Sequence, residues 1–333
     1  MNFATLPGLA VLNPGGRDPD QSFQNGPGKP SANEHAPINY HAYAACTRGS
    51  FYRTTDLAAR HRSVLLLLGK RLAESYRALE ILKAAGCFVA VSFKESGTHQ
   101  VAKQLSSPKR FKLFREIASE ADLCLSSTPD LVPLYASVCR QTVYLPTPYP
   151  LEFESWNFSC PQNKRQGIFI GTREFSIPSR NHLLVLASAR AFSVPVTVIN
   201  SDRGSGERAL KALKFPMDQL RISDPLPYPD YLRLMARHRF VLQFDQSSVP
   251  GQVAGDSLLC RIPTVGGNGA VERIAFPELH GHGRSFEEVL ALARRLLHDQ
   301  EFYEKQCVAV DSTRSLSFSS AFETMTHWLP YLA

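Results

Sequence analysis

Arginine and glycine residues follow one short apolar segment of this chain in a pattern that suits phosphate binding. The apolar run at 167–170 is followed by Gly171, Arg173 and Arg180. A glycine at the end of a strand lets the backbone approach a ligand, and two guanidinium groups carry forked donors that match a diphosphate. These three residues are therefore expected to bind a diphosphate. The alternative is that both arginines are solvated in a surface loop.

A second segment, 247–267, combines a proline turn, a glycine and an acid. A helix beginning at Gly251 would leave its first N–H groups free for phosphate, and Gln252 would lie in that first turn. Asp256 would lie one turn further along, where a carboxylate can accept hydrogen bonds from a ribose diol. The alternative is that Asp256 only complements the helix dipole.

The candidate ligand-binding residues can form one site only if the fold brings the ends of their strands together. From Ser63 onward, apolar runs of strand length alternate with segments of helical periodicity. This alternation predicts a mostly parallel sheet covered on both faces. The expected strands are 63–69, 87–93, 122–127, 142–146, 167–171, 194–200, 220–223, 239–244 and 262–266, and the expected helices include 72–85, 108–120, 179–192 and a helix beginning at Tyr228.

The pattern divides the chain into two doubly wound units. We expect a first Rossmann-like domain at 1–150, a Pro- and Asn-rich linker at 151–166, a ligand-binding domain at 167–310, and a C-terminal helix at 311–333 that packs back on the first domain. The predicted fold class is α/β, with two doubly wound domains facing a central cleft. The first 60 residues are less regular, with a first strand in GLAVLN.

Composition narrows the class of protein. Apolar residues make up 44% of the 333 residues, which is typical of a globular chain, and no apolar run approaches the length of a spanning helix. The seven cysteines are scattered without a CxxC pair, which favours reduced thiols and a cytoplasmic location. Residues 1–150 carry 17 Lys and Arg against 11 Asp and Glu, so the basic excess lies in the first half. This basic excess indicates either an anionic partner or charge that serves only solubility.

The densest basic segment lies in the predicted helix 108–120 and just before it. Its cations are interleaved with Phe111 and Phe114, which would face the core. A solvated helix face is one interpretation, and a surface for DNA or an anionic membrane is the other. The cations are Lys103, Lys109, Arg110, Lys112 and Arg115.

At 247–267 the chain resembles the retaining GT-B glycosyltransferases of group 1, whose donor domain carries a Glu-x7-Glu motif. Asp256 takes the place of the second acid, and SLLCRIPTVGGNGAVERI continues as the family does. The segment GIFIGTREFSIPSRN is similar to the family's phosphate loop. Eight places before Asp256 the chain has Ser248 instead of the first glutamate, which in the family touches the donor sugar; Asp245 is the nearest acid.

The resemblance implies roles for further residues. Pro227 and Tyr228 match the segment that borders the nucleotide base, and NPGGRDPDQ resembles the glycine loop after the family's first strand, which puts Gly15 and Gly16 near the donor phosphate. Lys94-Glu95 stands where the family often has His-Asp, so Glu95 is the candidate catalytic base, with His99 behind it. His41 is a further option. A solvated loop is the alternative for Glu95.

Together these observations predict a glycosyltransferase that uses a UDP- or GDP-sugar as co-substrate, with no other cofactor. We find no convincing Asp-x-Asp metal pair, and arginines and helix dipoles can neutralise a leaving diphosphate without a metal. The sequence leaves the acceptor unidentified; the anionic candidates are a lipid-linked or cell-surface glycan precursor at a membrane, or, as an alternative function, DNA with hydroxymethylated bases. A binding module that has lost turnover is the alternative. A dehydrogenase is disfavoured because no GxGxxG follows a first strand.

Overall fold

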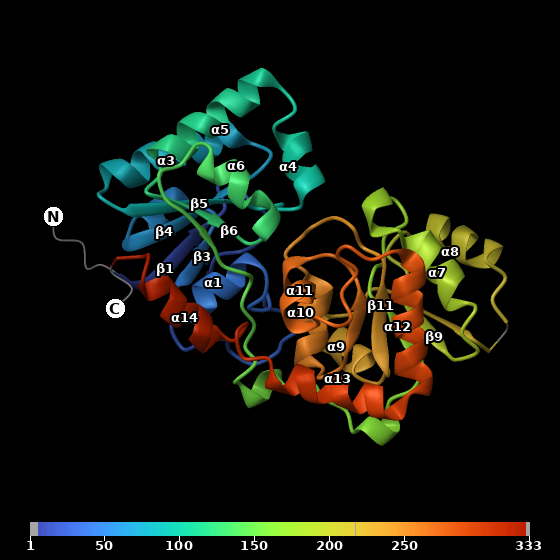
Figure 1. Cartoon of the computed structure of the whole chain (residues 1–333). Coiled ribbons are helices and arrows are strands. Elements are labelled where there is room, and N and C mark those ends of the chain that lie inside the picture. The colour runs from blue at the N-terminus through green and yellow to red at the C-terminus, as the bar shows by residue number, and fades with distance from the viewer. Residues whose placement is uncertain (1–5, 217, 331–333) are drawn as a thin grey trace. The chain divides into compact units, whose positions relative to one another are not determined.

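The computed structural model describes residues 6–216 and 218–330, which form two compact units (Figure 1). The first unit consists of the described residues of Met1–Lys29, Asn33–Glu152 and Arg314–Ala333, and the second consists of Pro30–Ala32 and the described residues of Phe153–Thr313. Residues 153–166 of the predicted linker thus belong to the second unit, and the C-terminal helix belongs to the first.

The first unit is built on a sheet of seven strands in the order β2-β3-β1-β4-β5-β6-β7. Every neighbouring pair is parallel except β2 and β3. The strands are β1 (Leu6–Leu12), β2 (Gln21–Ser22), β3 (Ser50–Tyr52), β4 (His61–Leu68), β5 (Phe88–Phe93), β6 (Leu123–Ser126) and β7 (Thr142–Tyr144).

Helices cover both faces of this sheet, which explains why its central strands contain nearly continuous apolar runs. In β4, Leu65 and Leu67 pack with α1 (Tyr40–Cys46) and α14 (Phe318–Thr326) on one face. Leu66 and Leu68 pack on the other face with α2 (Thr55–Ala58), α3 (Leu72–Ala84), α4 (Thr98–Gln104), α5 (Pro108–Glu120) and α6 (Val132–Ala136). Figure 1 shows α1 and α14 on the side opposite to α3 and α5.

The second unit is built on a parallel sheet of five strands in the order β10-β9-β8-β11-β12. Its strands are β8 (Ile168–Ile170), β9 (Val196–Ile199), β10 (Leu220–Ser223), β11 (Phe240–Gln243) and β12 (Thr264–Gly266). The helices are α7 (His182–Ala189), α8 (Arg203–Ala212), α9 (Tyr228–Met235), α10 (Gln252–Leu259), α11 (Ala270–Ala275), α12 (Phe286–His298) and α13 (Gln300–Ser312). Four 3-10 turns complete the two units: η1 (Pro129–Leu131), η2 (Glu154–Trp156), η3 (Gln162–Lys164) and η4 (Pro178–Arg180).

Most predicted elements from residue 63 onward are confirmed, and the helix predicted at 108–120 is found at Pro108–Glu120. The helix predicted at 179–192 is wrong at its start. Residues 178–180 form η4, Asn181 adopts a left-handed conformation with φ of 49°, and α7 begins only at His182. In the first 60 residues the sequence predicted only β1, and the structure adds β2, α1, β3 and α2.

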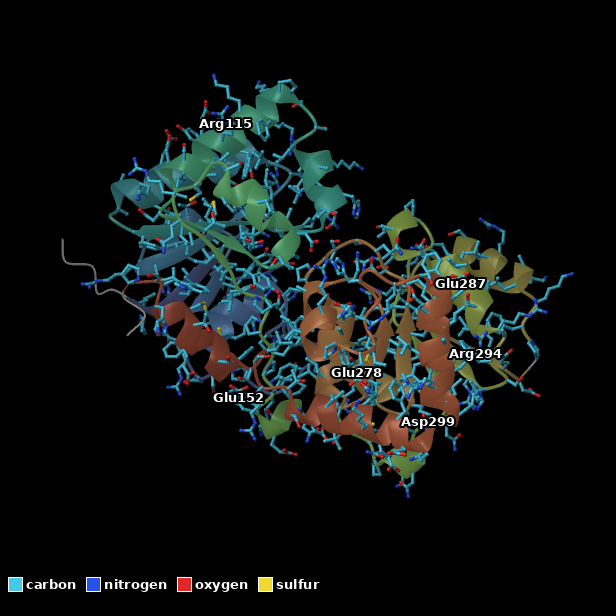
Figure 2. The ribbon with its side chains drawn as sticks, in the orientation of Figure 1. Arg115, Glu152, Glu278, Glu287, Arg294 and Asp299 are labelled. Carbon is cyan, nitrogen blue, oxygen red and sulfur yellow. The ribbon has the colours of Figure 1, made fainter. Side chains whose placement is uncertain are left out.

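The surface of the first unit carries a basic patch along α4 and α5. Ser107 caps α5 by accepting a hydrogen bond from the Arg110 N–H, and Pro108 occupies its first turn. Lys103, Lys109, Lys112 and Arg115 are exposed, and Figure 2 shows Arg115 on the outer side of α5. Among the helices that the structure describes, none has both the length and the apolar character needed to cross a membrane.

Candidate functional site

The topology of the second sheet places a ligand site at the carboxyl ends of β8 and β11. The chain moves from β8 through β9 to β10 on one side, and then returns to add β11 and β12 on the other. In open parallel sheets, ligands bind outside the carboxyl ends of the strands at such a reversal. The loops at 171–181 and 244–251 follow the two strands at this point, and they contain the predicted donor residues Gly171, Arg173, Arg180, Ser248 and Gly251.

An ion pair links these two loops. The Arg180 guanidinium donates to the carboxylate of Asp245, whose side chain is only 4% exposed, while that of Arg180 is 24% exposed. The Ser247 N–H donates to the other Asp245 oxygen at 2.8 Å, and Asn181 donates to the Phe244 carbonyl at 2.9 Å. Because Arg180 is held by Asp245, it is pre-positioned at the strand ends. Its Nε atom is buried and has no partner among the residues that the structure describes.

The N-terminus of α10 opens onto the same region. Gly251 caps the helix with φ of 96°, a conformation that glycine adopts without strain, and Gln252 is the first helical residue. The first N–H groups of a helix lack partners within the helix and attract anions. The loop before α10 is fixed by Asn268, which accepts from the Ser248 N–H at 2.8 Å and donates to the Ser248 hydroxyl at 3.2 Å.

Asp256 lies inside this site but is enclosed by protein. Its carboxyl group is buried, and the Tyr228 hydroxyl donates to it at 2.6 Å. Tyr231 and Gln252 also hydrogen-bond to it. Burial raises the pKa of Asp256 to about 7, although the Tyr228 hydrogen bond and the charge of Arg173 act in the opposite direction. Asp256, which was predicted to bind the ribose, is therefore hydrogen-bonded to Tyr228 in this structure.

A second buried acid, Glu272, was not among the predicted site residues. It lies in the first turn of α11, is 2% exposed, and accepts a hydrogen bond from Gln243 at 2.9 Å through Oε1. Oε2 has no partner among the described side chains and backbone. Burial and the nearby charge of Asp245 raise the pKa of Glu272 to about 7. A glutamate within the apolar sequence AVERIA, directly after a glycine-rich loop, was the available signal.

Three further residues that were predicted to bind the donor are a glycine packed against neighbouring side chains, a half-exposed arginine and an exposed proline. A Cβ at Gly171 would lie 2.5 Å from Val253 and 2.8 Å from Val241, so this glycine permits close packing of α10 on the sheet. The Arg173 side chain is half exposed and lies 3.4 Å from Glu174. Pro227 is exposed and forms the N-cap of α9, directly before Tyr228.

The loop after β8 contains one further buried polar group, His182. Its Nδ1 atom lies 2.9 Å from the Thr172 hydroxyl, and its ring packs edge-on against Phe175. Burial lowers the pKa of His182 to about 4, so the ring is neutral at physiological pH. Within the described part of the chain, its Nε2 atom has no hydrogen-bond partner. This histidine was not predicted, because a single histidine beside an apolar helix carries no distinctive spacing.

In the first unit, the predicted glycine loop lies after the carboxyl end of β1. Gly15 has φ of 63°, and its carbonyl accepts a hydrogen bond from Arg71 at 2.8 Å. A Cβ at Gly16 would lie 2.2 Å from the Asn13 amide, so the loop is tightly folded. Packing within the loop thus accounts for glycine at position 16 without a ligand.

The predicted catalytic residues of the first unit are less enclosed. The Glu95 side chain is 45% exposed and lies 4.0 Å from Lys70, and His99 is exposed in α4. His41 is buried, with its ring stacked 3.8 Å from that of Phe51. Burial and the charge of His35 lower the pKa of His41 to about 4.

The second unit therefore combines groups suited to an anionic, hydroxyl-bearing ligand. Unsatisfied buried polar atoms are uncommon in proteins, and they often mark the place of a water, ion or ligand. Arg180 at the end of η4, His182 at the start of α7 and Glu272 in α11 each contribute one such atom. Among the described residues, no group of three or more His, Cys, Asp or Glu side chains is arranged to hold a metal ion.

Comparison with known proteins identifies the fold. No protein-family model and no curated protein sequence matches the chain. Among solved structures, a sucrose-phosphate synthase from Thermosynechococcus elongatus is similar over 97% of this chain and 98% of its own, with 11% identity and a TM-score of 0.63. An alpha-glucosyltransferase in complex with UDP-glucose and DNA containing an abasic site is similar over 96% and 98%, with 9% identity and a TM-score of 0.61.

A third similar structure is that of an E. coli trehalose-6-phosphate protein bound with UDP-2-fluoro glucose. It covers 82% of this chain and 76% of its own, with 11% identity and a TM-score of 0.61. At these identities the likeness concerns the fold. The chain has the α/β fold of the GT-B glycosyltransferases, with a mostly parallel sheet of seven strands and a parallel sheet of five.

Proposed function

We propose that this protein is a glycosyltransferase that binds a nucleotide-diphosphate sugar at the strand ends of its second unit. The observation that carries the proposal is the set of polar groups at the switch point, where Arg180 is oriented by Asp245 beside the N-terminus of α10. A guanidinium and helix N–H groups bind phosphate without a metal ion. The similar structures solved with UDP-glucose and UDP-2-fluoro glucose support a UDP-sugar as the first donor to test.

In this proposal Asp256 and Tyr228 recognise the nucleoside. Asp256 is a single turn inside α10, and the Tyr228 hydroxyl that now donates to it lies at the start of α9. A ribose hydroxyl can replace the phenol as donor to the carboxyl group, which would leave the Tyr228 ring free to lie against the base. Pro227 fixes the start of α9 and thereby the position of that ring.

The proposed acceptor is anionic and binds to the first unit. In a β-α-β connection between parallel strands, the helix begins on the side of the sheet where the preceding strand ends, so α5 begins at the carboxyl end of β5. The exposed cations of α4 and α5 therefore lie on the same side as Glu95, our candidate base. Residues 103–115 contain five Lys or Arg and no acid. Phosphates of DNA or of a lipid-linked precursor fit this charge.

A thermal-shift screen with UDP-, GDP-, CDP- and ADP-sugars tests the donor site. We expect one nucleotide class to raise the melting temperature of the wild type, and Arg180→Ala and Asp256→Ala to reduce that rise. Arg208→Ala is the matched control, because Arg208 is exposed on α8 in the same unit. The proposed donor site is wrong if no nucleotide shifts the wild-type melting temperature.

Release of the nucleoside diphosphate then separates an enzyme from a binding module. The wild type is incubated with the selected donor and a panel of acceptors: DNA carrying hydroxymethylated bases, phosphorylated sugars and lipid-linked glycan precursors. Transfer to one of them, lost in Glu95→Gln and kept in His99→Ala, would assign the base to Glu95. Tight donor binding with no turnover across the panel would identify a non-catalytic binding module, in line with Ser248 at the place of the family's first acid.

A further inference from the structure

The carboxyl group of Glu272 is enclosed by three glycines. A Cβ at Gly251 would lie 2.0 Å from Glu272 Oε2, and a Cβ at Gly269 would lie 2.3 Å from the same oxygen. A Cβ at Gly267 would lie 3.0 Å from Oε1. Side chains at these positions would displace the carboxyl group, so the three backbone segments are shaped around it.

The same glycines belong to the two segments that meet at the proposed donor site. Gly251 caps α10, whereas Gly267 and Gly269 lie in the loop between β12 and α11. The N–H groups of Ala270 and Val271 donate to the carbonyls of Val249 and Pro250, each at 3.0 Å. Glu272 therefore occupies the joint between the first turn of α11 and the loop that leads into α10.

The charged groups around Glu272 oppose one another. Asp245, after β11, disfavours an ionised carboxylate at Glu272, whereas Arg180, from η4, favours it; Gln243 of β11 donates to Oε1. Asp256 of α10 is the other buried acid of the site. With the pKa of Glu272 near 7, the group is divided between its neutral and ionised forms at physiological pH.

We propose that Glu272 is a positioning residue: its carboxyl group fills the space between Gly251, Gly267 and Gly269, and its ionisation weakens anion binding at the N-terminus of α10. The inference rests on the proposed nucleotide-sugar site. An ionised Glu272 adds a negative charge beside the N–H groups that face the donor diphosphate, and like charges disfavour one another. By linkage, donor binding must then draw a proton onto Glu272.

Calorimetric titration measures this linkage directly. UDP-glucose and GDP-mannose are the probes, because a sugar diphosphate diester has no ionisation between pH 6 and pH 8. Titrations in two buffers with different ionisation enthalpies give the number of protons taken up. At pH 8, one unit above a pKa of about 7, about one Glu272 in eleven is neutral, so we expect wild-type affinity about tenfold weaker than at pH 6.

Glu272→Gln keeps the shape of the side chain and its contact with Gln243 but cannot ionise. We expect it to bind the donor with nearly the same affinity at pH 6 and pH 8 and with much less proton uptake. Asp256→Asn removes the other buried acid of the site. The variant should still take up a proton when it binds the donor, because Glu272 is unchanged. A residue with only a structural role would change affinity equally at both pH values.

The outcomes distinguish this inference from the proposed function. Absence of binding by both probes at every pH would remove the proposed donor site. Donor binding without pH dependence in the wild type, or pH dependence retained in Glu272→Gln, would overturn the role of Glu272 and leave the donor site standing. Absence of pH dependence in the wild type overturns the role of Glu272 even if the variant fails to fold.

Discussion

Replacing Arg180 by alanine tests the ion pair on which the site is built. The substitution removes the guanidinium that links the loop after β8 to the loop after β11, and it leaves Asp245 buried without its cation. We expect the variant to lose stability as well as donor binding. The loss of stability can be measured without knowing the donor.

The size of the stability loss in Arg180→Ala depends on how deeply Arg180 and Asp245 are buried. Removing one member of a fully buried ion pair costs about 3 to 5 kcal/mol, because the other charge remains uncompensated. Arg180 is 24% exposed, and the Ser247 N–H still donates to Asp245 in the variant. We therefore expect a loss of about 2 to 3 kcal/mol, less than the full value. For a unit of this size it corresponds to a fall in melting temperature of about 5 to 10 °C.

A double-mutant cycle shows whether the loss comes from the unpaired carboxylate. Free energies of unfolding are measured by urea denaturation for Arg180→Ala, Asp245→Asn and the double variant, with Arg208→Ala as a surface control expected within about 0.5 kcal/mol of the wild type. The double variant should be more stable than the sum of the single losses predicts, by about 1 to 3 kcal/mol. Additive losses would refute the ion pair as the source of the effect.

Three further predictions concern the same unit. Gly171→Ala should lower stability by about 1 to 3 kcal/mol in thermal unfolding, because its methyl group would overlap Val253; no change would show that α10 can move aside. Tyr228→Phe should raise the pKa of Asp256 above about 7, since a hydrogen bond to the ionised form is lost, and a carboxyl titration followed by NMR would detect the shift or contradict it. Because burial raises the pKa values of Asp256 and Glu272, the folded state binds protons that the unfolded state has released between about pH 4 and pH 7. Stability should therefore fall with rising pH by up to about 1.4 kcal/mol per unit and per group, and Glu272→Gln should flatten the slope measured by urea unfolding.

The layer structure could be predicted from sequence because both sheets are covered on both faces. Strands such as β4 then contain a continuous apolar run, Val64–Leu68, and the amphipathic helices between them begin at recognisable residues, as α5 does at Ser107 and Pro108. The region before residue 60 follows no such rule. Helix α1 is buried along nearly its whole length and has no polar face, so the sequence YHAYAAC lacks a helical period.

The site could be predicted only to the level of its loops. Sequence placed Arg180 and Gly251 at strand ends, because the alternation of elements fixes where strands end. It could not show that Asp245 binds Arg180, or that Glu272 reaches Gln243, since the two residues of each pair are 65 and 29 positions apart in the sequence. Gly171 was predicted to let a ligand approach the backbone. In the structure, the close packing of Val253 is enough to explain why a glycine occupies this position.

The raised pKa values of the two buried acids determine whether this site suits an anion. Each of the two arginines that follow β8 is paired with an acid: Arg173 with Glu174, and Arg180 with Asp245. If Asp256 and Glu272 were also ionised, the site would carry an excess of negative charge and would repel a diphosphate. Burial keeps both acids largely neutral below about pH 7, so the helix N–H groups and guanidinium groups dominate the local field. The same burial that destabilises the fold at high pH therefore makes the strand ends receptive to a donor phosphate.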